Sequence, residues 1–365
     1  MPSFLLPDPA PPHPYVKTSV LRSRLGFAIL AAMRSTLNIF IHCLVVVIIF
    51  GVAIAPLMAR ADSHPSAWDY AWPRTDFTTH SVPFGDILSG GPPKDGIPSI
   101  DNPVFIPVAD VTSLSDTEPV IGLHVGDEAK AYPLQVLTWH EIVNDEIAGI
   151  PVTVTFCPLC NSSIVFDRRL EGRVLDFGTT GNLRNSDLVM YDRQTETWWQ
   201  QFLGQGIIGE LTGKSLTMMP SRLESWASFR KRSPNGLVLV PNDPTMRRYG
   251  RNPYGGYDSA DFPFLYRGEM PKDVNPMVRV VAVDDQAWTL PLLRQRTSIE
   301  AGDLRLTWRS GQNSALDSAA IAQGRDVGNV VVQRQVDGEW RDTVHDITFA
   351  FVFHVFRPDG TIHAL

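Results

Sequence analysis

The stretch VTVTFCPLCNSSIVFDR (residues 152–168) sets two cysteines between two short runs of β-branched and apolar residues. Runs of about four to eight such residues are typical of β-strands. The segment between the runs is short, so the pattern predicts a β-hairpin with Cys157 and Cys160 at its tip. Two thiols at one turn can bind a metal, act as a redox pair, form a structural disulfide or stay buried and reduced.

Similar strand-like runs recur along the chain from residue 104 onwards. They are VFIPV (104–108), VIGLHV (120–125), DLVMYD (187–192), GLVLV (236–240), VRVVAV (278–283) and TFAFVFHVF (348–356). Residues 133–144 instead have helical spacing and begin with a proline suited to a first turn. In residues 221–232, Ser221 and Glu224 match a helical capping box. The sequence therefore predicts a mainly β fold of the α+β class, an antiparallel β-rich single core with a few short helices.

The composition changes along the chain and suggests its organisation. Residues 62–103 are rich in Pro, Gly, Ser and Asp, which predicts an extended lead-in. Residues 104–292 hold most of the strand-like runs and predict a β-rich core domain with the cysteine turn. Residues 293–365 alternate polar turns with short strands. They predict a C-terminal β region, either a small subdomain or the completion of the same sheet system.

Residues 1–61 have the features of a signal peptide or an N-terminal anchor. Residues 37–57 contain no charged side chain, basic residues precede them, and MARA follows and ends at Ala61. A basic region, an apolar region and a small-residue ending describe a secretory signal, and we expect cleavage after Ala61. Without cleavage, about 20 apolar residues can span a bilayer. Because residues 1–32 are long and proline-rich for a signal peptide, we expect translation to start at Met33.

In either case residues 62–365 are expected outside the cytoplasm, in the periplasm or another extracytoplasmic space. A membrane is an expected partner only through an uncleaved N-terminal segment. The whole chain has a net charge of −7, and five of its basic residues precede residue 62. An acidic exported part without basic runs argues against a nucleic-acid partner. We expect an exported protein or a small ligand as the partner instead.

The cysteine spacing narrows the chemistry of the turn. A C-P-x-C sequence on a hairpin resembles the metal-binding knuckles of zinc ribbons and rubredoxins. Thioredoxin-like pairs usually open a helix whose N-terminus lowers the thiol pKa, whereas a β-like run follows Cys160. The third cysteine, Cys43, lies in the apolar N-terminal segment, so a closed four-cysteine site within one exported chain is excluded. A metal here needs a further ligand from His, Met, Asp or a second protomer.

Two thiolates completed by a His or a Met favour a soft transition metal, and copper is the ion that we expect. The candidate further ligands are His124, His140, Met190, His345 and His354. His140 is the first choice, because its segment lies just upstream of the strand that leads into the turn. Short connections make such elements neighbours in space.

Two segments carry further candidate site residues. The polar residues of WHEIVND (139–145) are expected to bind a ligand or to supply an acid–base pair, and His140 and Glu141 are the catalytic candidates beside Cys157 and Cys160. The alternative for this segment is the solvated side of an amphipathic helix.

The second segment, residues 177–204, offers residues for binding a cofactor or ligand. Arg184 and Asp187 are candidates for its polar groups, and Tyr191 and Trp198 for lining its pocket. The alternative is ordinary hairpin packing. The glycine-hinged loop NPYGGYD (252–258) borders a site or forms a turn-rich connection.

Residues 131–168 and 175–213 together resemble a bacterial and archaeal family called domain of unknown function 3179. The resemblance covers about residues 100–290 and continues more loosely through RYGRNPYGGYD and VRVVAV. It implies an exported domain with a single cysteine knuckle, and it implies no substrate.

These observations lead to three functional hypotheses. The first is an exported protein whose cysteine turn binds a transition metal, copper above all, for metal handling or redox chemistry. The second is a thiol–disulfide exchange protein acting on other exported proteins. The third is a non-catalytic ligand- or partner-binding module in which the two cysteines form a structural disulfide. The absence of G-x-S-x-G, P-loop, H-E-x-x-H and dinucleotide motifs argues against the commonest hydrolases, kinases and nicotinamide enzymes.

Overall fold

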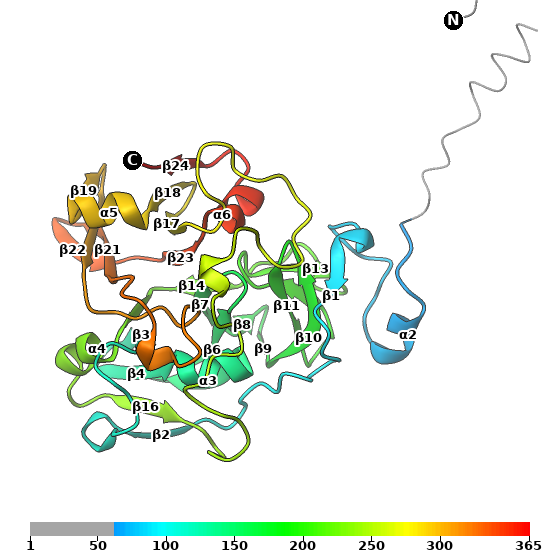
Figure 1. Cartoon of the computed structure of the whole chain (residues 1–365). Helices are drawn as coiled ribbons and strands as arrows, with labels where there is room; N and C mark the ends of the chain where they lie inside the picture. The colour runs from blue at the N-terminus through cyan, green and yellow to red at the C-terminus, as the bar shows by residue number, and fades with distance from the viewer. Residues whose placement is uncertain (1–61) are drawn as a thin grey trace, which may run out of the picture. The chain divides into compact units, whose positions relative to one another are not determined.

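A computed structural model describes residues 62–365 (Figure 1). The predicted signal peptide or anchor, with Cys43, lies outside the described residues. Residues 62–365 form one compact unit that is β-rich, with antiparallel sheets and a few short helices, which confirms the predicted fold class. Within this range, no helix is both long enough and apolar enough to cross a membrane.

Five sheets of four or five strands make up most of this unit, and they are arranged as a five-bladed β-propeller. In spatial order, the sheet of the cysteine hairpin contains β14 (Thr217–Met219), β7 (Ser162–Asp167), β6 (Ile150–Cys157) and β5 (Ile142–Ile147). A second sheet contains β1 (Ile87–Ser89), β10 (Phe177–Arg184), β11 (Asp187–Asp192), β12 (Trp198–Gln200) and β13 (Gln205–Ile208).

The other three large sheets are also mainly antiparallel. One contains β15 (Ser221–Ser225), β3 (Pro119–Val125), β4 (Glu128–Pro133), β16 (Leu237–Val240) and β2 (Val104–Pro107). The next contains β23 (Asp346–Phe349), β17 (Arg279–Val283), β18 (Gln286–Thr289) and β24 (Thr361–His363). The last contains β19 (Ser298–Ala301), β20 (Leu304–Arg309), β21 (Asn329–Val336) and β22 (Glu339–Asp342). Only the pairs β16–β4 and β18–β24 are parallel within the described sheets.

Short elements complete the described part of the chain. The α-helices are α2 (Ala67–Ala71), α3 (Leu134–His140), α4 (Trp226–Arg232), α5 (Leu290–Arg296) and α6 (Ala350–Phe356). A small ribbon pairs β8 (Arg169–Leu170) with β9 (Arg173–Val174). Strands β23 and β24 pair with β17 and β18, so the end of the chain completes a sheet that begins before residue 293.

The helix predicted over residues 133–144 is shorter in the structure. Helix α3 ends at His140, because Glu141 adopts a positive φ of 58° that is incompatible with a continuing right-handed helix. The chain then runs directly into β5. Because the helix ends between them, His140 and Glu141 line different cavities.

Two further local predictions are wrong in part. In residues 221–232 the first five residues form β15, and α4 begins at Trp226 with Ser225 as its N-cap. The run 348–356 is a strand only as far as Phe349 and continues as α6. Short apolar runs fit a buried strand or a buried helix equally well, so strand pairing at a distance decides between them.

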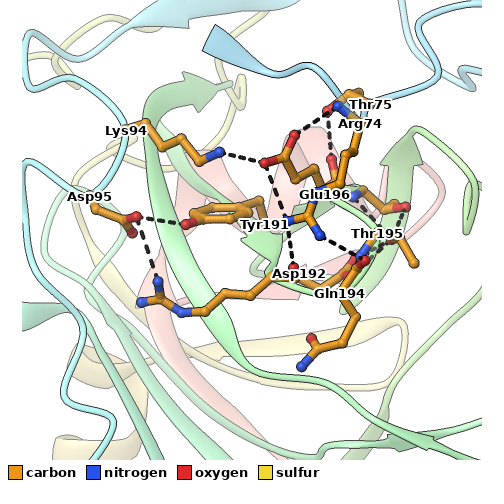
Figure 2. Close-up of polar contacts among 11 residues, drawn as sticks. Arg74, Thr75, Lys94, Asp95, Tyr191, Asp192, Gln194, Thr195 and Glu196 are labelled. Carbon is orange, nitrogen blue, oxygen red and sulfur yellow. Dashed lines mark hydrogen bonds and ion pairs between the residues drawn. The ribbon is translucent and has the colours of Figure 1, made fainter.

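The lead-in is fixed to the second sheet by polar contacts (Figure 2). The Lys94 Nζ lies 2.7 Å from Glu196 Oε1, and the backbone N–H of Arg74 donates to Glu196 Oε2 at 3.0 Å. The Tyr191 hydroxyl donates to Asp95 Oδ2 at 2.6 Å. The lead-in is therefore part of the folded unit rather than a free approach to it.

Gly181 of β10 is a point of close contact with this lead-in. It has a φ of +74°, and a Cβ added there would overlap the carbonyl oxygen of Pro92. We expect Gly181→Ala to lower the free energy of unfolding by about 2 kcal/mol or more, from positive-φ strain plus the overlap. Urea unfolding measures this, with Gly172→Ala as control, because Gly172 has a φ of +78° but open space around it. Equal losses in both variants would contradict the overlap.

Candidate metal centre at the cysteine turn

The cysteine turn closes the hairpin between β6 and β7, as predicted. Cys157 pairs with Ser162 at the end of the ladder, and the Cys160 N–H donates to the Cys157 carbonyl at 3.2 Å. Asn161 completes the turn with a φ of 52°, and its side-chain amide donates to the Ile347 carbonyl at 2.7 Å. Both cysteines are buried and free, so the turn presents two thiols and no disulfide.

A second hairpin brings Asp187 to these thiols. One ligand atom each from Cys157, Cys160 and Asp187 lies within 4.8 Å of the others, and all three residues are buried. Asp187 begins β11 after the two-residue turn Asn185–Ser186, in which both residues have positive φ, as type I′ hairpins require. The Ser186 carbonyl lies 3.8 Å from the Cys157 sulfur and 3.5 Å from the Cys160 sulfur. Two hairpin tips therefore meet at this point.

The Asp187 carboxylate is held on one side only. Its Oδ2 accepts hydrogen bonds from Gln200 Nε2 at 2.6 Å and from the Phe202 N–H at 2.9 Å. Its Oδ1 is buried and forms no hydrogen bond of normal geometry within residues 62–365, although the Cys157 and Cys160 thiols lie close enough to this carboxyl group to offset part of the rise that burial causes in its pKa. Arg184 donates to Gln200 Oε1 at 3.3 Å and lies 3.5 Å from Asp86 Oδ2. Arg184 therefore supports Gln200, which in turn positions the carboxylate.

Buried acidic groups gather around the turn without a compensating cation. Burial raises the pKa of Glu141 to about 8, and the charge of Asp187 adds to that rise. Burial also raises the pKa values of Asp187 and Asp346 to about 6. It raises the thiol pKa values of Cys157 and Cys160 as well. Within the described chain, none of these groups forms an ion pair with Lys, Arg or His, so a bound cation would relieve the cost of their burial.

Glu141 lines a cavity of about 450 Å³ beside the turn. Its carbonyl accepts the Phe156 N–H at 2.8 Å, which fixes its backbone against β6. Its carboxyl group has no hydrogen-bond partner among the described residues. Leu159 from the cysteine turn and Tyr254 and Tyr257 from the glycine-hinged loop also line this cavity. The loop of residues 252–258 therefore borders the cavity, which is the first of the two roles predicted for it.

His140 is not a member of the group formed by the two cysteines and Asp187. Its Nδ1 lies 2.7 Å from the Pro98 carbonyl and its Nε2 lies 2.8 Å from the Tyr249 hydroxyl. It lines a separate cavity of about 250 Å³. The structure therefore does not bring His140, the first-choice histidine, to the thiols. Both of its ring nitrogens already have protein partners.

The remaining predicted site residues lie elsewhere in the second sheet. Met190 is fully buried in the largest hydrophobic cluster and pairs with Thr179 and Trp199 across the sheet. Tyr191 and Trp198 pack against Trp72 of the lead-in, with ring centroids 4.9 and 5.0 Å from it, and neither lines the cavity beside Glu141. The structure thus unites Asp187 and Glu141 with the cysteine turn and leaves these aromatic residues in the packing.

Sequence reasoning missed the groups that position the site. Ser186, Gln200 and Asp346 carry no motif, because each acts through contacts between segments far apart in the chain. The sequence also offered no reason to expect the positive φ of Ser186, because residues other than glycine rarely adopt it. The only available signal was the short polar turn before Asp187.

Comparison with known proteins gives one match. No curated protein matches the chain, and no solved structure matches it. A family model described as "Protein of unknown function (DUF3179)" matches residues 94–360. The match confirms the resemblance and extends it through the C-terminal β region beyond residue 293. It spans well over half of the sequence, and the chain therefore belongs to this family.

Proposed function

We propose that Cys157, Cys160 and Asp187 bind a transition-metal ion. The observation that carries this proposal is the meeting of three buried ligand atoms within 4.8 Å, drawn from two hairpin tips. The buried Asp187 Oδ1 supports it, because the two thiols beside this carboxylate are only weak donors and a metal ion would satisfy the oxygen better. The surplus of buried acidic groups supports it too, since a cation stabilises their charged forms.

The ligand set favours zinc over copper. The expectation of copper depended on His140 or Met190 as the third ligand, and a carboxylate takes that place in this proposal. Zinc accepts thiolate, imidazole and carboxylate ligands, whereas copper(I) prefers soft thiolate and thioether ligands. Three protein ligands and one open position are typical of zinc sites that bind a substrate. We place this open position on the side of the cysteine turn that faces Glu141 and the cavity. As an expected exported protein, the chain would carry this site outside the cytoplasm.

Thiol–disulfide exchange is the second candidate. The two sulfurs lie near disulfide distance, which favours a redox pair or a structural disulfide. However, exchange requires the thiolate form of the attacking cysteine. Burial raises the pKa of both thiols, so few thiolates form at neutral pH without a metal. The metal proposal therefore ranks first.

Elemental analysis of the full chain, purified without chelator, tests the metal proposal. We expect close to one equivalent of zinc, and less than about 0.1 equivalent in Cys157→Ser/Cys160→Ser, because the variant lacks both thiolates. Asp187→Asn keeps the shape of the side chain and should weaken zinc binding at least tenfold. His140→Gln is the control and should keep its metal.

Three results separate the alternatives. If the protein contains copper instead of zinc and the cysteine variant contains none, the site is supported and the proposed identity of the ion is wrong. Metal that persists in the cysteine variant would contradict the site. A metal-free protein with a disulfide visible by mass would contradict metal binding and favour the exchange or structural-disulfide hypotheses.

A further inference from the structure

We propose that the cavity beside Glu141 binds a small organic cation, an amine with an apolar body, whose ammonium group pairs with the Glu141 carboxylate. The proposal adds a second ligand to the site. It does not require the metal, because the cavity, its aromatic residues and Glu141 lie outside the proposed set of metal ligands.

The cavity has the size and lining of a small-molecule site. Its volume of about 450 Å³ lies within the range of roughly 300–1,000 Å³ found for ligand pockets. Apolar and aromatic side chains dominate the lining, with Leu159, Leu188, Tyr254, Tyr257 and Phe264 among them. Gly255 and Gly256 line the cavity on the loop side, and a Cβ added at Gly256 would meet open space. Such a surface stabilises an apolar body by removing it from water.

Glu141 supplies the polar group that fixes an orientation. The residue is only 7% exposed, and the structure leaves its carboxyl group facing the cavity without a protein partner within residues 62–365. A carboxyl group that is this buried gains most from a charged donor, since an ion pair strengthens as the surroundings lose water.

The charges around the cavity select against anions. Among the described residues that line it, none is Lys, Arg or His. Asp187 and Cys157 lie close enough to Glu141 for their charges to interact with it, and Cys160 belongs to the same group of ligand atoms. A divalent metal bound by two thiolates and one carboxylate still leaves a net negative centre. The cavity therefore repels an anion and attracts a cation, with or without the metal.

Aromatic rings add a second source of selectivity. Tyr254, Tyr257 and Phe264 line the cavity, and an ammonium group near the face of an aromatic ring is stabilised by its quadrupole. The rings are held in place: the Tyr257 hydroxyl donates to the Leu159 carbonyl at 3.0 Å, and the Gly256 N–H donates to the Asp317 carbonyl at 2.6 Å. Fixed aromatic rings and one carboxyl group in the same cavity suit an amine.

Three probes of matched shape test the proposal: 2-phenylethylamine, 2-phenylethanol and 3-phenylpropanoate. The measurement is isothermal titration calorimetry of the full chain at about pH 9, a pH at which an alkylamine is still largely protonated. We expect the amine to bind at least tenfold more tightly than the alcohol, and the propanoate to show no saturable binding. Glu141→Gln should reduce the amine-to-alcohol ratio to within about twofold. Glu146→Gln, at an exposed position five residues away, should leave the ratio unchanged.

Several outcomes would overturn the proposal. They are a propanoate that binds as tightly as the alcohol, a preference for the amine that survives in Glu141→Gln, and the absence of binding by all three probes. If Glu141→Gln does not fold, Tyr254→Leu provides the test and should reduce amine affinity at least threefold. The Cys157→Ser/Cys160→Ser variant should keep the amine preference while losing metal, so that failure of one proposal is distinguishable from failure of the other.

Discussion

Replacing Arg279 by methionine should lower the free energy of unfolding by about 3–5 kcal/mol, because it leaves a buried carboxylate short of its partner. Arg279 and Asp258 are 6% and 0% exposed at their side chains, and their charged atoms lie 3.2 Å apart. Arg279 also donates to Ser314 Oγ at 2.7 Å. In the variant, the cation that remains for Asp258 is Arg325, at 3.0 Å, whose side chain is 45% exposed. The buried Ser314 hydroxyl, which donates to Asp258 Oδ2 at 2.5 Å, remains as a neutral partner.

The same change should disturb the cavity. Asp258 belongs to the glycine-hinged loop that carries Tyr254 and Tyr257, so the loss of Arg279 releases the loop from β17. We therefore expect weaker binding of 2-phenylethylamine in Arg279→Met, even under conditions in which the variant remains folded.

Urea unfolding with matched variants measures this effect. Asp258→Asn/Arg279→Met removes both charges and should recover part of the lost stability. The control is Arg334→Met, which breaks the surface pairs with Asp284 and Asp303 and should cost about 1 kcal/mol or less. Similar losses in Arg279→Met and Arg334→Met would show that burial of the Asp258 pair carries no special cost.

Glu141→Gln should remove a large part of the pH dependence of stability in the metal-free protein. Burial raises the pKa of Glu141 from 4.5 to about 8, so the folded protein keeps a proton that the unfolded chain releases within this window. The stabilisation from the protonated carboxyl is complete below about pH 4.5 and is lost as the pH rises through about 8. The effect should reach a few kcal/mol, since one pKa unit corresponds to about 1.4 kcal/mol.

Urea unfolding at about pH 5 and pH 9 in the presence of a chelator measures the difference. Between pH 5 and pH 9, the free energy of unfolding should fall by roughly 2–4 kcal/mol more in wild type than in Glu141→Gln. Asp187 and Asp346 titrate in both proteins, so their contribution cancels in the comparison. Glu146→Gln, at an exposed position, should follow wild type. Equal pH slopes in wild type and Glu141→Gln would show that Glu141 is not buried as an acid.

Local sequence patterns were sufficient to predict several parts of this protein. Turn residues between two β-branched runs predicted the hairpin of Cys157 and Cys160, and the ladder of β6 and β7 confirms it. The β-rich class follows from the same pattern, because period and residue type act over a few neighbouring positions. The family could also be identified from the motifs around the turn, and the family match confirms it.

Which side chains meet at the site depends on long-range packing. Asp187 reaches the thiols because a second hairpin ends beside the first, and His140 turns away because a positive φ at Glu141 ends α3. Runs such as residues 348–356 became part strand and part helix through pairing with β17. These outcomes depend on contacts between residues far apart in the chain, whose geometry no local pattern encodes, and they determine the site itself.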